Sequence, residues 1–254
     1  MTHHPGAPLK NPRAPRPGAD AAHSRLLTAA ARLAETGAAH RLVVGILRGA
    51  GARDREQTHA LRGHLAAHGI TSRDLGPLPP EPDHRGTQPF PRPRVHLLLH
   101  DGDFRPLQAL RLAAQWQLPL LSPYLPPGEE ETGTVFRARR RAVMAAWRPG
   151  EARDIAVHRL TVYPVLPGAG RLSLDLDGEP LLPPAGAAAH LTLTPDGRLA
   201  LRLGDDPRHR TADRIVCRAG SADFRLDLDG THTTRLTGPL RVEALPGRLH
   251  LITP

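Results

Sequence analysis

The sequence predicts an α/β + β fold, in which a small parallel-sheet N-terminal domain precedes a β-sandwich-like C-terminal domain. Up to about residue 124, short apolar runs alternate with amphipathic segments, which is the order of β-α-β units. From Ile155 onward the chain holds only short alternating runs separated by Gly, Pro and Asp, as in antiparallel strands joined by turns. The 254 residues can bury the cores of two such domains.

The α/β domain is predicted over residues 23–124, after a basic, Pro-rich segment, residues 1–22, that we expect to be a disordered tail. Segment 76–94 is predicted to be a surface loop, because its prolines fix φ and remove hydrogen-bond donors. The expected elements are helices over residues 24–35, 54–68 and 106–117, and strands over residues 42–47, 95–99 and 118–121.

Residues 125–154 are predicted to be a linker and a helix, the helix covering the basic segment 137–148 and ending at Pro149-Gly150. The β domain then covers residues 155–254. Its strands are predicted over residues 159–165, 171–176, 190–193, 198–203, 214–218, 224–228, 240–244 and 248–252.

The β domain contains an internal duplication. The sequence LDLDG at residues 174–178 recurs at residues 226–230, and the turn PDGRL at 195–199 is followed in the second copy by LPGRL at 245–249. Because the order is the same in both copies, we predict two related hairpin units.

Composition excludes several functions. The only lysine is Lys10, in the N-terminal segment, so a P-loop and a Schiff-base enzyme are both excluded. The single cysteine, Cys217, lies in an apolar run and is predicted to be a buried residue in a reduced, cytoplasmic protein. No apolar run is long enough for a transmembrane segment. His59, His64 and His68 are expected to be solvated helix positions, and no metal site is predicted.

The net charge of +9 comes almost wholly from arginines spread along the chain, which favours compositional bias over a nucleic-acid partner. The dense exception is the group Arg137, Arg139, Arg140 and Arg141. These arginines could meet a phosphate, but a solvated helix face is the more common reason for such a group. We therefore expect no nucleic-acid partner.

The stretch VHLLLHDGDFRPLQALRLAAQWQLPLL, residues 95–121, carries a more specific signal. It resembles the corner of the NAD kinase and diacylglycerol kinase superfamily, in which a strand runs into GGDGT and then a helix. Asp101, Gly102, Asp103, Phe104 and Arg105 stand at the five motif positions. The resemblance implies ATP-dependent phosphoryl transfer to a hydroxyl group, with ATP and Mg²⁺ as cofactors. It also implies Asp103 as the acceptor base, with Asp101, Gly102 and Arg105 at the nucleotide turn.

The turn after the first predicted strand, RGAGAR at residues 48–53, contains Gly49 and Gly51. A glycine turn before a helix can present N–H groups to an anion, but glycines in tight turns between a strand and a helix are also common without a ligand. Lipid kinases carry a glycine-rich turn at this same place, so the resemblance implies a nucleotide contact at Gly49 and Gly51.

The segment LSLDLDGEPLLPP, residues 172–184, resembles the DGEP segment in the β domain of lipid kinases. By that resemblance Asp177 and Glu179 are further catalytic candidates, as acids that serve a metal or a substrate hydroxyl. The residues alone equally fit a hairpin turn, since Asp-Gly is a strong turn signal. That simpler interpretation applies more strongly to Asp229 in the second copy, where Thr231 replaces the glutamate.

Two hypotheses follow. The first is a working kinase with Asp103 as the base. The second is a non-catalytic nucleotide- or phospholipid-binding or assembly module of the same fold, because Phe104 adds a side chain where glycine permits close approach and Asp101 adds a repelling carboxylate. A homo-oligomer formed through the β domain is compatible with both.

Overall fold

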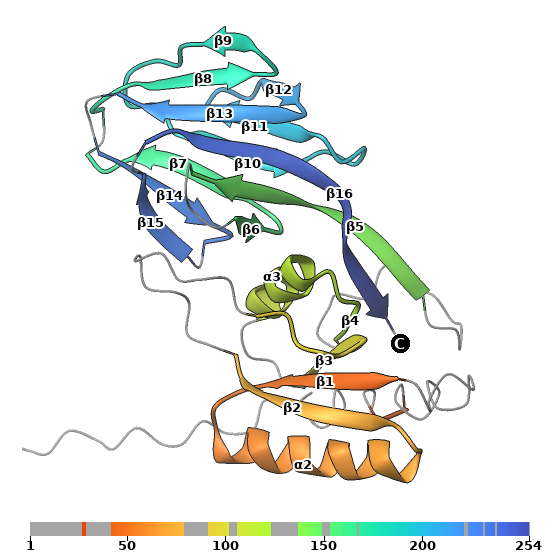
Figure 1. Cartoon of the computed structure of the whole chain (residues 1–254). Helices are drawn as coiled ribbons and strands as arrows, with labels where there is room; N and C mark the ends of the chain where they lie inside the picture. The colour runs from red at the N-terminus through yellow and green to blue at the C-terminus, as the bar shows by residue number, and fades with distance from the viewer. Residues whose placement is uncertain are drawn as a thin grey trace, which may run out of the picture.

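The computed structural model describes residues 27–28, 42–78, 91–101, 106–122, 137–148, 153–166, 168–220, 223–230, 232–236 and 238–253. Over these residues the chain forms a ten-stranded mixed sheet and a six-stranded sheet. Figure 1 shows the antiparallel strands of the two sheets in the upper half, with the parallel strands of the larger sheet and α2 below. The α/β + β fold class is confirmed.

The parallel part of the large sheet has the order β2-β1-β3-β4-β16. Its last member is only the end of β16, where Leu251 and Ile252 pair in parallel with Leu120 and Leu121 of β4. One strand therefore belongs to both halves of the protein. The bounds are β1 Val43–Arg48, β2 Thr71–Pro77, β3 Leu97–Asp101, β4 Leu120–Leu121 and β16 Leu240–Thr253.

Two helices cover opposite faces of the parallel strands. Helix α2, Ala52–Ala67, buries Leu61 and Leu65 against one face. Helix α3, Pro106–Trp116, packs with Leu98 and Leu120 on the other face. In α2 the buried residues Thr58, Leu61 and Leu65 have the three- and four-residue spacing that gives a helix one buried side. In α3 residues 108–110 and 112–114 are all buried, so most of the surface of this helix is covered. The predicted helices over residues 54–68 and 106–117 are thus confirmed.

The rest of the large sheet is antiparallel and stacks on the six-stranded sheet to form the sandwich. Phe224, Leu160 and Met144 are among the side chains buried between the sheets, and Cys217 is buried there as predicted. The strands are β5 Arg137–Trp147, β6 Asp154–Ala156, β7 Leu160–Pro164, β8 Leu172–Leu176, β9 Glu179–Leu181, β10 Ala189–Leu193, β11 Leu199–Leu203, β12 His209–Ala212, β13 Arg214–Ala219, β14 Phe224–Leu228 and β15 His232–Leu236.

The prediction of a helix over residues 137–148 is wrong. These residues form β5, which pairs with β16 from Arg137↔Thr253 to Arg141↔Leu249 and again from Val143↔Leu245 to Trp147↔Arg241. Ala, Arg and Met favour helices, but propensity is weak against ten cross-strand partners and a buried centre, residues 143–146. The arginines of this segment lie on a strand, not on a helix face.

Two further differences come from short or interrupted patterns. Strand β2 was not predicted, because most of its residues are exposed or half-buried and it lacks an apolar run. The predicted strands over residues 240–244 and 248–252 are one strand, β16, with an irregular register between Leu245 and Leu249. Most of the predicted helix over residues 24–35, and all of the segment 1–22, lie outside the described residues. Among the described residues, no helix is long and apolar enough to cross a membrane.

Candidate functional site

The candidate site is the edge of the parallel sheet where β1, β3 and β4 end. Open α/β sheets bind ligands at the carboxyl ends of their strands. At this edge Arg48 pairs in register with Asp101, which is the last residue of β3. The turn with Gly49 and Gly51 follows Arg48 directly, so the structure brings these predicted nucleotide contacts beside Asp101.

The carboxylate of Asp54, in the first turn of α2, closes the turn between β1 and α2. Oδ2 of Asp54 accepts the backbone N–H of Gly51 at 2.9 Å. A Cβ atom at Gly49 would lie 2.2 Å from that same oxygen, so a side chain there would displace the carboxylate of Asp54. A phosphate entering this turn would meet a negative charge. In this conformation the N–H of Gly51 is bound to Asp54, and the nucleotide contact at Gly49 and Gly51 stays a prediction.

Arg48, a cation at this edge, already binds neighbouring acceptors. Nε of Arg48 donates to both carboxylate oxygens of Asp74 on β2, at 3.1 and 3.0 Å. Its Nη1 donates to the carbonyl of Gly49 at 3.0 Å. Asp74 in turn accepts the N–H of Gly76 at 2.8 Å. Arg48 therefore holds the end of β1 to β2 and stabilises the turn that follows.

One residue before Asp101, the first of the five motif positions, His100 forms a buried polar pair with Ser122. Nδ1 of His100 on β3 is 3.2 Å from Oγ of Ser122, which follows β4, and the two residues are 0% and 2% exposed. They extend the register Leu98↔Leu120 and Leu99↔Leu121 by one step. This pair joins the ends of β3 and β4 beside the motif, and no motif in the sequence predicted it.

The core of the predicted site lies outside the described residues. Gly102, Asp103, Phe104 and Arg105 fall between the end of β3 and the start of α3 at Pro106. Their roles as base and nucleotide turn therefore stay predictions.

Asp177 and Glu179 are not near this edge. They occupy the turn and first residue of the β8–β9 hairpin. From β3 the sheet reaches β8 only across β4, β16 and β13, and β16 pairs with β4 at residues 251–252 but with β13 at residues 240–243. Figure 1 shows β8 and β9 at the top of the sandwich, with the parallel strands below. The carboxylate of Asp177 accepts the N–H groups of Asp213 and Arg214 at 3.0 and 2.8 Å. The catalytic role of Asp177 and Glu179 stays a prediction.

The second copy of the duplicated turn contains an aspartate whose contacts extend beyond the turn. Asp229, the counterpart of Asp177, has a side chain that is 0% exposed and an ion pair to Arg111 of α3 at 3.0 Å. Both aspartates have positive φ, 53° and 57°. Duplication predicted the shared turn, but the contact with α3 has no sequence signal, because 118 residues separate Arg111 from Asp229.

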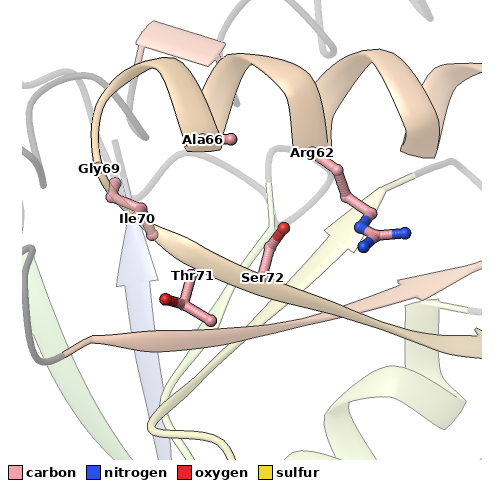
Figure 2. Close-up of a pocket in the computed structure, with 6 residues that line it drawn as sticks. All are labelled: Arg62, Ala66, Gly69, Ile70, Thr71 and Ser72. Atoms are coloured by element: carbon pink, nitrogen blue, oxygen red, sulfur yellow. The ribbon is translucent and has the colours of Figure 1, made fainter.

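A separate hollow of about 370 Å³ lies between α2 and the start of β2. Figure 2 shows the side chain of Arg62 extending from α2 above this strand. Because β2 begins here, the hollow is at the opposite edge of the parallel sheet from Asp101. It is lined by Arg62, Ala66, Gly69, Ile70, Thr71 and Ser72. Within the described part of the chain, no three His, Cys, Asp or Glu residues are placed to hold a metal ion.

Comparison with known proteins identifies the architecture. No family model matches the sequence. No curated protein matches it either. The structure is similar to an NAD kinase from Archaeoglobus fulgidus in complex with ATP, with a TM-score of 0.50 and 9% identity over 84% of this chain and 93% of that one. Yeast NADH kinase complexed with NADH gives a TM-score of 0.48 and 12% identity over 84% and 82%. The protein has the fold of the NAD kinases.

Proposed function

We propose that this protein binds a nucleotide at the carboxyl edge of β1, β3 and β4 and does not transfer its phosphate. The fold supports the binding part, since a protein of this architecture is known in complex with ATP. The single observation that carries the non-catalytic part is the Asp54 carboxylate bound to Gly51, because it closes the turn that would otherwise approach a phosphate.

The motif sequence supports the same conclusion. The resembled motif has glycine where this chain has Asp101 and Phe104, and threonine where it has Arg105. The replacements at residues 101 and 104 add a side chain where glycine allows the backbone to approach a triphosphate closely. A nucleotide bound here is therefore held mainly by groups other than a phosphate-enclosing backbone turn.

ATP-dependent phosphoryl transfer is the second candidate, and Asp103 favours it. An aspartate is retained at the position that the resemblance assigns to the acceptor base. Such a reaction would require ATP and Mg²⁺, because a divalent ion spreads the charge of the transferring group. The two candidates differ in product formation and not only in binding.

The test is the melting temperature of the full-length protein with millimolar Mg-ATP, NAD and NADP in separate samples. A ligand that binds only the folded state raises this temperature, by an amount that depends on its concentration relative to Kd. We expect a rise with at least one nucleotide, in the original protein and in the exposed control Asp205→Ala alike.

Product formation is then measured with Mg-ATP and NAD together. Binding without NADP or ADP would agree with the proposal. Turnover that disappears in Asp103→Ala would establish the kinase instead. No thermal shift with any nucleotide would refute both candidates.

A further inference from the structure

The six-stranded sheet carries a row of polar side chains on the face that it turns away from the core of the sandwich. Leu160, Leu191 and Leu201 point into that core from β7, β10 and β11. Because side chains alternate between the two faces of a strand, the residues next to these leucines point to the opposite face. Strand pairing aligns them in one row: His209 opposes Arg202, Arg202 opposes His190, His190 opposes Thr161, and Thr161 opposes Asp227.

His190, in the middle of this row, is held by a hydroxyl group. Nδ1 of its ring lies 3.3 Å from Oγ1 of Thr161, which is 9% exposed. When the hydroxyl donates to Nδ1, the neutral ring carries its proton on Nε2. Within the described part of the chain, Nε2 of His190 forms no hydrogen bond. Its N–H group is therefore available to a ligand.

Arg202, beside His190 in the row, is a cation that no carboxylate pairs with among the described residues. Its Nη1 donates to the carbonyl of Gly204 at 3.0 Å. Neighbouring strands lie about 4.8 Å apart, so His190 and His209 flank the base of this side chain on either side at about that distance. The row thus places three side chains with N–H donors next to one another on three adjacent strands.

Asp227, the carboxylate in the same row, is bound elsewhere. Its Oδ1 accepts the N–H of Gly230 at 2.7 Å, and its Oδ2 accepts the hydroxyl of Thr233 at 3.3 Å. Arg202 lies three strands away from Asp227 along the sheet, which is about 14 Å. Asp227 therefore does not neutralise the guanidinium of Arg202.

The electrostatic potential around His190 is positive. Burial lowers the pKa of His190, and the cations of Arg202 and Arg159 lower it further. The carboxylate of Asp205 raises this pKa, but its effect is the smallest of the four. Surroundings whose charges disfavour an imidazolium favour a bound anion for the same reason.

We propose that Arg202, His190 and His209 form a binding site for a phosphate group on the outer face of the six-stranded sheet. The planar guanidinium of Arg202 can donate to two phosphate oxygens at once, and Nε2 of His190 donates to a third. His209, at the exposed end of the row, adds a donor from the edge strand β12. The site belongs to a different sheet from the carboxyl edge of β1, β3 and β4, so it does not depend on the proposed nucleotide site.

The test follows the imidazole signal of His190 by nuclear magnetic resonance in the full-length protein. His190→Gln identifies this signal among those of the 15 histidines. Added inorganic phosphate should shift the signal until the site is saturated, and it should raise the pKa of His190 by about one unit, because an adjacent anion favours the imidazolium. Sodium chloride at the same ionic strength is the control, since salt alone screens Arg202 and Arg159. An equal rise of the pKa in chloride and in phosphate would overturn the proposal.

Variants then locate the site. Arg202→Gln should raise the Kd of phosphate by about tenfold or more, because a charge-assisted hydrogen bond is lost. Arg218→Gln, which removes an exposed arginine from β13 in the other sheet, should leave the Kd unchanged. Equal Kd values in the original protein and in Arg202→Gln would refute the assignment. Should Arg202→Gln not fold, the comparison of phosphate with chloride at His190 decides alone.

A second titration distinguishes the two sources of the phosphate group. Glycerol 3-phosphate replaces inorganic phosphate, with the His190 signal again as the readout. Tighter binding of the ester would assign the site to a phosphorylated molecule, and equal or weaker binding would assign it to free phosphate. If neither compound shifts the signal more than chloride does, the row is a structural feature of the sheet and the proposal fails, whatever the protein binds at the carboxyl edge.

Discussion

The carboxylate of Asp54 and the backbone N–H of Gly51 lie 2.9 Å apart, and this hydrogen bond forms where a phosphate would be expected in a nucleotide-binding turn. A Cβ atom at Gly49 would lie 2.2 Å from the same carboxylate, so a side chain there would have to displace it. The glycines of this turn are therefore explained by an internal contact. Their presence in the sequence does not by itself require a ligand.

Removing the Asp54 carboxylate should have two opposite effects. Asp54→Ala should lower the free energy of unfolding by about 0.5–2 kcal/mol, the usual range for losing a side-chain contact at a helix start. It should also strengthen binding of pyrophosphate, because a negative charge has left the turn. Chemical denaturation and calorimetric titration measure the two effects. Glu56→Gln is the control, since Glu56 is exposed on the same helix; similar anion affinity in both variants would contradict the account.

Two loops of the sandwich touch at a pair of glycines. Gly186 has φ of 74°, and a Cβ atom there would lie 2.4 Å from Cα of Gly168. Gly186→Ala should therefore destabilise by about 2–4 kcal/mol, combining overpacking with left-handed backbone strain. Gly178→Ala provides the comparison, because Gly178 has φ of 98° but open space around it, so its cost is about 1 kcal/mol. Equal losses in denaturant unfolding would refute the steric argument.

The stability of the sandwich should depend on the protonation of His190. Burial lowers the pKa of His190 below its ordinary value of 6.5, and the cations of Arg202 and Arg159 lower it further against the opposing effect of Asp205. As pH falls through 6.5, the unfolded chain therefore takes up this proton before the folded one does, and folding stability decreases.

Replacing His190 should reduce this loss. We expect the free energy of unfolding to fall less between pH 7 and pH 5 in His190→Gln than in the original protein. His209→Gln, at an exposed position on β12, is the control. An identical pH dependence in the original protein and in His190→Gln would show that His190 contributes nothing.

The thiol of Cys217 should be unreactive in the folded protein. Cys217 is fully buried on β13, and burial raises its pKa to about 12. Because the thiolate is the reactive form, a disulfide reagent at pH 8 should label Cys217 only when the chain opens. Labelling in native buffer should be at least a hundredfold slower than in denaturant. Rapid native labelling would mean that β13 is accessible in solution.

The sequence was sufficient to predict a parallel α/β part followed by a β sandwich, because the spacing of apolar residues indicates which side of a helix or strand is buried. It failed at β5, where the residues prefer a helix and only the remote strand β16 makes them extended. It failed again at β2, an edge strand without an apolar run. Both errors concern pairing between distant segments, which local patterns do not encode.

The sequence singled out Asp101 and the turn at Gly49 separately. Only the pairing of Arg48 with Asp101 shows that the two places are adjacent. The contacts that control this region were not predictable, since His100 meets Ser122 and Arg111 meets Asp229 only after folding. The duplicated LDLDG sequence showed that the two turns are alike, but only the structure shows that Asp229 is buried against α3 whereas Asp177 is partly exposed.

Strand β16 pairs with strands of both halves of the protein, so the parallel sheet can be completed only late in synthesis. Leu251 and Ile252 supply the neighbour of β4, so the strand order β3-β4-β16 cannot be completed until those residues have left the ribosome. During synthesis, the edge of β4 remains open while more than a hundred further residues are added. The unpaired N–H and C=O groups of such an exposed strand edge can pair with another chain and cause aggregation. The edge of β4 is therefore protected from pairing with other chains only once β16 has been synthesised and has paired with it.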